Sequence, residues 1–210
     1  DLTKGFTQNS GKEDSYDQSR VDYLKEYNSH IKSVDPEAVM ICEHFVDEEN
    51  WELGWAGIKV WRNMNKAFCQ SQMGWSSDSD FTSLAYQYNT GSSQISTNFP
   101  FGTLVGYMES HDEERTNYKT QNYGTSTAKT FAVRLKRAGL NAAFCFLAPG
   151  PKMIWQYGEL GYDYSKFYDW DSKTTKEGDD MVKTKKKPYV ADSYFSNSNR
   201  NDCSNFNCYE

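Results

Sequence analysis

The chain has 210 residues, enough for one domain of ordinary size or for a part of a larger one. Its net charge of −6 gives no support for binding to nucleic acid or to an anionic membrane surface. No run of about 20 apolar residues is present, so the sequence predicts no membrane-spanning helix. The five cysteines are an odd number without zinc-type spacing, which argues against a disulfide framework and a zinc site.

The sequence is rich in aromatic residues. They make up 16% of the chain, with 15 tyrosines and 6 tryptophans, and they are spread among polar residues. Rings beside carboxylates and amides suit binding to the faces of sugars, although ordinary aromatic packing gives the same composition. For Trp155, we expect a core position in the last predicted strand. Three cysteines in apolar contexts, Cys42, Cys69 and Cys145, are expected to be buried.

The first predicted element is a helix over residues 19–36. Apolar residues recur at helical spacing from Val21 to Ile31, Ser19 can cap the helix, and Pro36 ends it.

Beyond this helix, strands and helices are predicted to alternate. Four short apolar runs are typical of strands that are covered on both faces, at residues 38–45, 57–65, 102–110 and 151–159. Helices are expected between them, at residues 65–73, near 80–88 and at 126–148, the last with Thr125 or Ser126 as its cap. This alternation predicts an α/β fold built from parallel βαβ units. From about residue 162 the pattern ends, and residues 164–210 are expected to form a charged surface loop and a polar tail.

Acidic residues occur at the ends of three of these predicted strands. Glu43 lies near the end of the first, His111 and Asp112 follow the third, and Glu159 follows the fourth. In barrels and open α/β sheets, the carboxyl ends of strands and the loops after them build the functional site. A carboxyl group in an apolar setting has its charged form disfavoured, the property wanted in a general acid.

Each of these residues also has a purely structural interpretation. Glu43 could be the partner of a buried arginine or lysine, His111 could be hydrogen-bonded in place, and residues 112–114 could form a solvated turn. The three sites together are more informative than any one of them.

Four motifs, in order along the chain, resemble the α-amylase family of retaining glycoside hydrolases. They are "DLTKGFTQ" at 1–8, "ICEHF" at 41–45, "ESHDEER" at 109–115 and "PGPKMIWQYGELGYD" at 149–163. The resemblance implies a partial (β/α)8 TIM-type barrel, roughly strands 5 to 8 with their helices. Residues 1–163 would then be the second half of the catalytic barrel, and residues 164–210 a loop and tail at its end.

The resemblance also implies roles for individual residues. Asp1 matches the nucleophile, Glu43 the general acid/base, and Asp112 the carboxylate that holds the distorted sugar ring, together with His111. Lys4 matches a lysine on the aglycone side. The implied substrate is a starch-type α-glucan oligosaccharide or polysaccharide. No metal ligand is assigned in this chain, although calcium is possible in the full-length family. The implied location is secreted or periplasmic.

The resemblance leaves alternatives open. Such a barrel needs about 250 residues, so the chain offers its second half and is expected to be inactive alone. Gly5 and Lys152 stand where many members have histidine and proline. A glucan transferase would use the same carboxylates. A catalytically silent half barrel, acting as a carbohydrate-binding or self-pairing module, is the alternative outside the enzymes, because open strand edges must be covered or paired.

Overall fold

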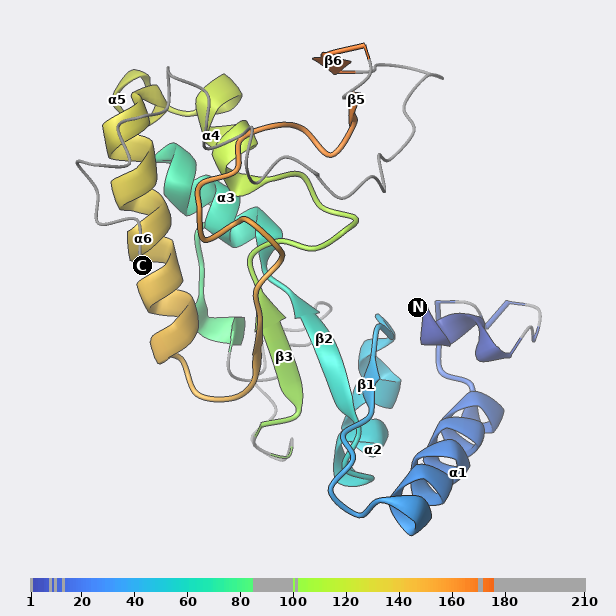
Figure 1. The fold of residues 1–210 in the computed structure, drawn as a ribbon. Coiled ribbons are helices and arrows are strands. Elements are labelled where there is room, and N and C mark those ends of the chain that lie inside the picture. Colours follow the sequence, from blue (N-terminus) through green and yellow to red (C-terminus); the bar gives the residue numbers. More distant parts are fainter. Residues whose placement is uncertain are drawn as a thin grey trace.

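The computed structural model describes residues 2–7, 9, 11–12, 14–84, 100, 102–169 and 172–175. Asp1 and residues 176–210 lie outside the described residues, as does much of the helix expected near 80–88, of which a 3-10 turn, η2 (Thr82–Leu84), is described. A second 3-10 turn, η1 (Thr3–Phe6), lies near the start of the chain. Figure 1 shows helices and strands alternating along the middle of the chain.

A parallel four-stranded sheet forms the centre of the fold. Its strands are β1 (Ile41–Cys42), β2 (Lys59–Asn63), β3 (Leu104–Tyr107) and β4 (Lys152–Met153), in the order β1-β2-β3-β4. Val60 pairs with Leu104 across β2 and β3, and Gly106 pairs with Lys152 across β3 and β4. The predicted α/β class and all four strands are confirmed, although each strand is shorter than predicted. The described strands form an open sheet, and no closed barrel is seen among them.

The first helix, α1 (Gln18–Val34), was predicted with the wrong cap. Asp17 is the N-cap, because its carboxylate accepts a hydrogen bond from the N–H of Ser19 at 3.0 Å. Ser19 therefore lies inside the first turn, where its hydroxyl also binds Asp17. The helix ends at Val34, before Asp35 and Pro36, as the proline predicts.

Two helices were not predicted, α2 (Asp47–Trp55) and α4 (Thr116–Tyr123). Both have weak apolar periodicity. Three consecutive acidic residues, Asp47, Glu48 and Glu49, fill the first turn of α2, where they complement the helix dipole. That acidic turn was the available signal for α2.

The other helices follow the prediction more closely. Helix α3 (Asn65–Met73) ends at Gly74, whose φ of 89° gives the left-handed C-cap. The long helix predicted at 126–148 is divided into α5 (Ser126–Lys129) and α6 (Phe131–Leu147), because Thr130 has extended backbone. Thr125 caps α5, accepting a hydrogen bond from the N–H of Ala128 at 3.3 Å.

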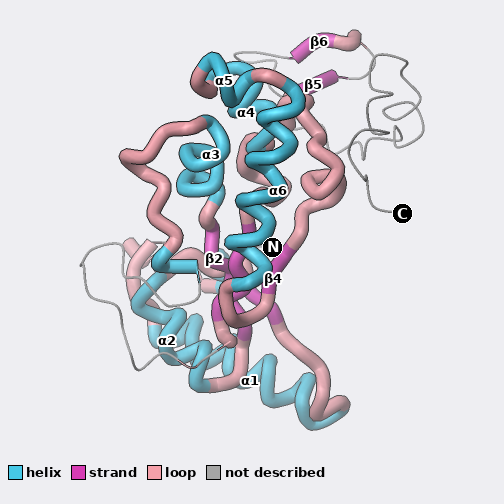
Figure 2. The backbone as a smooth tube through the Cα atoms, turned by 90° about the vertical axis from the view of Figure 1, so that its left-hand side faces the viewer, coloured by secondary structure: helices cyan, strands magenta, loops and turns pink. Residues whose placement is uncertain are grey.

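The core lies between the helices and one face of the sheet. Cys42, Val60 and Leu104 pack with Leu24 of α1 and Leu53 of α2. A second cluster joins α3, η2 and α6 through Phe68, Leu84 and Cys145. Figure 2 shows α6 running alongside the strands. The predicted burial of Cys42, Cys69 and Cys145 is confirmed, and all three thiols are free.

The segment after residue 163 contains more order than predicted. A short antiparallel hairpin is formed by β5 (Tyr168–Asp169) and β6 (Thr174–Thr175). Just before it, Asp163 is buried in an ion pair with Arg134 of α6 at 2.7 Å. The surface loop expected from residue 164 is therefore tied to the helices at its beginning.

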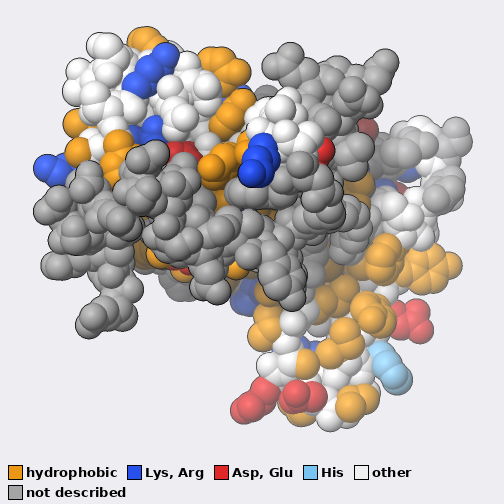
Figure 3. All heavy atoms as spheres, turned by 45° about the horizontal axis from the view of Figure 1, so that its top comes forward, with side chains coloured by type: hydrophobic (Ala, Val, Ile, Leu, Met, Phe, Trp, Pro, Cys, Tyr) orange, Lys and Arg blue, Asp and Glu red, His pale blue; other side chains and the backbone are white. Residues whose placement is uncertain are grey.

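Apolar side chains are also found on the surface. Tyr23, Tyr27 and Val34 of α1 are exposed, and hydrophobic side chains are visible at the lower right of Figure 3, where α1 lies. None of the described helices has the length and apolar character needed to cross a lipid bilayer.

Candidate functional site

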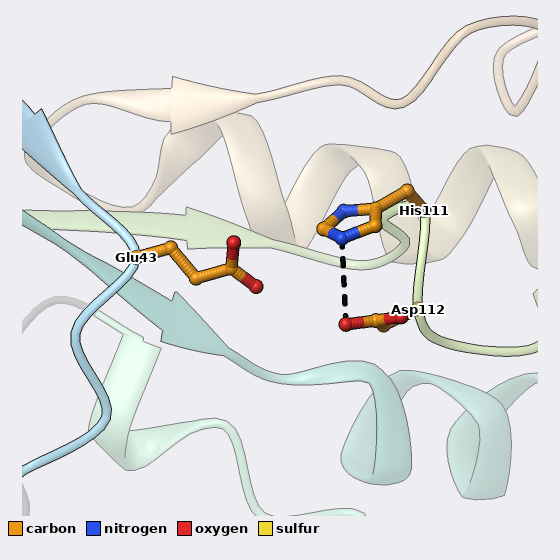
Figure 4. A group of neighbouring side chains, drawn as sticks. All are labelled: Glu43, His111 and Asp112. Carbon is orange, nitrogen blue, oxygen red and sulfur yellow. Dashed lines mark ion pairs between the residues drawn. The ribbon is translucent and has the colours of Figure 1, made fainter. Parts of the chain in front are cut away.

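The predicted acid and the predicted His-Asp pair meet at the carboxyl edge of the sheet. Glu43 follows β1, and His111 and Asp112 follow β3. One ligand atom from each side chain lies within 4.8 Å of the others. In Figure 4, the carboxylate of Glu43 points from its loop toward the other two side chains. The three are called the Glu43 cluster below.

The Glu43 cluster has a buried side and an open side. Glu43 is 6% exposed, whereas the side chains of His111 and Asp112 are 38% and 42% exposed. The Nε2 atom of His111 lies 3.4 Å from Oδ2 of Asp112. A ligand can therefore reach His111 and Asp112 from solvent. Glu43 lies deeper in the protein, where it is mostly shielded from water.

Aromatic rings frame the cluster. The ring centroid of His111 lies 5.9 Å from Trp61 of β2 and 6.2 Å from Trp155, which follows β4. Trp61 also packs edge-on against Tyr107 at 5.3 Å and Phe45 at 6.5 Å. The core position expected for Trp155 is wrong, because its ring is half-buried beside His111. Trp61 and Phe45 were missed, since single rings in a strand and a loop give no distinctive pattern.

Pairing in the sheet explains why these rings lie on the site side. Neighbouring residues of a strand face opposite ways, so Val60 faces the helices and Trp61 faces away from them. Tyr107 shares the Trp61 face and is fully buried there. Its burial, with the negative charges of Glu113 and Glu43 nearby, raises the pKa of the Tyr107 hydroxyl, which therefore stays protonated.

Most charges of the run at 109–115 are structural. Glu109 is buried and accepts hydrogen bonds from Arg115 at 2.9 Å and from the N–H of Thr116 at 2.7 Å. Glu114 accepts from the Ser165 hydroxyl at 2.7 Å and from the N–H of Lys166 at 2.9 Å. These contacts correct the solvated-turn interpretation for Glu114.

Glu113 is also engaged within the protein. It accepts hydrogen bonds from Asn63 of β2 and from the hydroxyl of Ser110. The other acidic side chains of the run are thus held by hydrogen bonds within the protein. His111 and Asp112 are the two members of the run whose side chains join the Glu43 cluster.

The remaining predicted residues lie elsewhere. The ammonium group of Lys4 forms an ion pair with Asp14, and its proposed contact with sugar stays a prediction. Glu159 is exposed in the turn after β4, where it lines an apolar groove beside α6 rather than the Glu43 cluster. Asp1 lies outside the described residues. Thr3, two positions further along the chain, donates its N–H to the carbonyl oxygen of Glu43 at 2.8 Å.

Two carboxylates and an imidazole also make the Glu43 cluster a possible metal site. Among the described residues, it is the one such group of three or more His, Cys, Asp or Glu side chains. Calcium takes 6 to 8 oxygen ligands, so this donor set does not fit it well and is closer to what zinc or another transition metal accepts.

Comparison with known proteins adds no assignment. The chain matches no protein-family model, and no curated protein matches it.

Proposed function

We propose that the chain carries part of the active site of a retaining α-glucan hydrolase, formed by the second half of a (β/α)8 barrel. The observation that supports this most strongly is the convergence of Glu43, His111 and Asp112 at the carboxyl edge of a parallel sheet. The sequential order of the four strands also favours a barrel, because each crossover advances the sheet in the same direction.

In this mechanism, the carboxylate of Asp1 forms a bond to the anomeric carbon while the glycosidic C–O bond breaks. Glu43 gives its proton to the leaving oxygen. In the second step, water attacks the anomeric carbon, the ester to Asp1 breaks, and the proton of water passes to Glu43. The scheme requires the two carboxyl groups to be about 5–5.5 Å apart.

The other members of the cluster bind the sugar. Asp112 and His111 stand at the open mouth, where they can accept and donate hydrogen bonds to hydroxyl groups of the ring. Hydrogen bonds that shorten as the ring flattens stabilise the transition state more than the bound substrate. The half-buried rings of Trp61 and Trp155 both lie next to His111, where they can pack against a sugar that His111 binds.

Tryptophan fluorescence offers a direct test of sugar binding. Titration with maltoheptaose should change the emission of Trp61 and Trp155, and His111→Ala should remove most of this response. Glu48→Gln is a matched control, because Glu48 is an exposed acid of α2 outside the cluster. A folded chain that shows no response would contradict the proposed site.

Hydrolysis is tested separately, by the release of reducing ends from soluble α-glucan. Any cleavage should fall about 10²–10⁴-fold in Glu43→Gln and stay unchanged in Glu48→Gln. Cleavage that persists in Glu43→Gln would remove Glu43 from the mechanism. Products longer than the substrate would identify a glucan transferase instead of a hydrolase.

The second candidate is a half barrel that pairs through its strand edges. It is supported by exposed apolar side chains at both edges of the described sheet, which are Ile41 in β1, Val39 just before it and Ile154 just after β4. Sedimentation would then give a dimer, and Ile154→Lys would return it to a monomer. A monomer throughout would contradict this candidate.

A further inference from the structure

A network of buried polar side chains begins at His44, the residue after Glu43. His44, Glu49 and Arg20 are all 0% exposed. Burying charged groups is costly unless they are paired and hydrogen-bonded. His44 follows β1, Glu49 lies in the first turn of α2, and Arg20 lies in the first turn of α1. Three separate elements are therefore joined at one carboxylate.

Glu49 accepts hydrogen bonds at both of its oxygens. Oε2 accepts from Nε of Arg20 at 2.9 Å and lies 2.6 Å from Nε2 of His44. Oε1 accepts from the N–H of Asp17 at 2.7 Å and from Nη2 of Arg20. Burial acts to raise the pKa of Glu49, but the hydrogen bonds from His44, Arg20 and Asp17 outweigh it, so the pKa is lowered.

Both ring nitrogens of His44 have a partner. A carboxylate oxygen only accepts, so Nε2 of His44 donates to Oε2 of Glu49. On the other side of the ring, the hydroxyl oxygen of Thr3 lies 2.9 Å from Nδ1.

Thr3 connects this network to Glu43. Its N–H donates to the carbonyl oxygen of Glu43 at 2.8 Å, and its hydroxyl oxygen lies 3.1 Å from the same carbonyl. The hydroxyl oxygen therefore bridges Nδ1 of His44 and the carbonyl oxygen of Glu43. This bridge fixes the orientation of Thr3, while the backbone N–H of Thr3 also holds Glu43.

We propose that His44 is a positioning residue for Glu43, acting through Thr3. The assignment rests on the proposed function for the role of Glu43 as acid/base. The chain of contacts runs from Arg20 and Glu49 through His44 to Thr3. It ties Thr3 to Glu43, the residue that follows β1, forty positions further along the chain. It also places Thr3, two residues after the predicted nucleophile, beside the predicted acid.

The hydrogen bonds of His44 are measured in the unaltered chain by 15N NMR of the imidazole. The expected result is a hydrogen bond at both ring nitrogens, at Nε2 to Glu49 and at Nδ1 to Thr3. An Nδ1 resonance typical of a nitrogen without a hydrogen bond would overturn the proposal without any variant being needed.

Thr3→Val removes the hydroxyl at nearly constant shape, and Thr3→Ser keeps it. In Thr3→Val, the Nδ1 resonance should move toward that of a nitrogen without a hydrogen bond, and the 13C signals of the Glu43 carbonyl and carboxyl groups should shift. Thr3→Ser should restore both. A purely structural role for Thr3 would lower stability in Thr3→Val but leave the carboxyl signal of Glu43 in place, and that result would also overturn the proposal.

These measurements need no sugar, so they separate the two proposals. Failure of the maltoheptaose titration, with the expected hydrogen bond at Nδ1 of His44 and the expected Glu43 shifts, removes the glycosidase assignment and leaves the structural coupling. Normal sugar binding with an unshifted Glu43 in Thr3→Val removes the positioning role alone.

Discussion

Replacing Glu49 by glutamine tests how much the buried network contributes to stability. The Glu49→Gln substitution would keep the shape of the side chain but remove the ion-pair partner of the Arg20 guanidinium, which is 0% exposed. Both Arg20 and His44 present hydrogen-bond donors to the same oxygen, Oε2. An amide offers one acceptor oxygen and directs its NH2 group at the remaining donors, so at least one donor loses its partner.

The expected loss of unfolding free energy is about 3–5 kcal/mol, the usual effect of removing one partner from a buried ion pair. Because about 1.4 kcal/mol corresponds to a factor of ten, the ratio of folded to unfolded chain should fall by roughly two to three and a half orders of magnitude. Urea unfolding measures the change. With a slope of about 2.5 kcal/mol per molar urea, the midpoint should fall by roughly 1–2 M.

Glu52→Gln is the matched control, since Glu52 lies in the same helix and pairs with Lys25 at 2.6 Å. Their side chains are 22% and 35% exposed, so this pair should contribute about 0–1 kcal/mol. If Glu49→Gln lowers the urea midpoint no more than Glu52→Gln does, the argument that the Arg20–Glu49 pair is desolvated is wrong.

The same variant has a defined pH dependence. The folded-state pKa of Glu49 is below its unfolded value, so the carboxylate contributes stability that is complete above the unfolded value of about 4.3. That contribution is lost as the pH falls through the folded-state pKa. The difference in unfolding free energy between the unaltered chain and Glu49→Gln should therefore be largest near neutral pH and shrink in acid. A difference that grows in acid would contradict this sign.

Three further predictions concern packing, capping and thiol reactivity. Gly106→Ala should cost about 1–3 kcal/mol of unfolding free energy, because the new Cβ would lie 2.6 Å from a methyl group of Leu84; a melting temperature equal to that of the unaltered chain would contradict this. Thr125→Ala should cost about 1 kcal/mol in urea unfolding through loss of the α5 cap, whereas Thr125→Ser should cost less. Burial raises the pKa of the Cys42 thiol to about 11, so a thiol reagent at pH 8 should modify it only at the rate of unfolding; fast labelling of the folded chain would show that the thiol is accessible.

The strands were predictable from sequence because each is a short apolar run covered on both faces. The two missed helices, α2 and α4, are amphipathic only weakly, so periodicity did not identify them. Helix α4 begins at Thr116, whose N–H donates a hydrogen bond to the buried carboxylate of Glu109. The local sequence pattern does not show this contact. Likewise, the break at Thr130 divides a stretch whose composition favours a single helix. Local propensity set the type of each element, and contacts between distant segments set its bounds.

The candidate site was predictable to a similar extent. The positions of Glu43, His111 and Asp112 after strands were enough to predict that they would meet, because parallel strands bring their carboxyl ends to the same edge. The sequence could not show which charges of the run at 109–115 are structural. Glu114, for example, accepts hydrogen bonds from the hydroxyl of Ser165 and the N–H of Lys166, and this distant segment reaches Glu114 only through folding.

The dipeptide Glu43-His44 shows how one short stretch can serve both the site and its support. Alternation along an extended chain places consecutive side chains on opposite sides, so Cys42 and His44 face the helices while Ile41 and Glu43 face away from them. Glu43 can then join His111 and Asp112, and His44 can join the buried carboxylate of Glu49. A shift of one residue in this register would exchange the two side chains, burying Glu43 among the helices and turning His44 toward the open edge. The pairing of Cys42 with Val60 in the sheet is therefore part of what places the acid at the site.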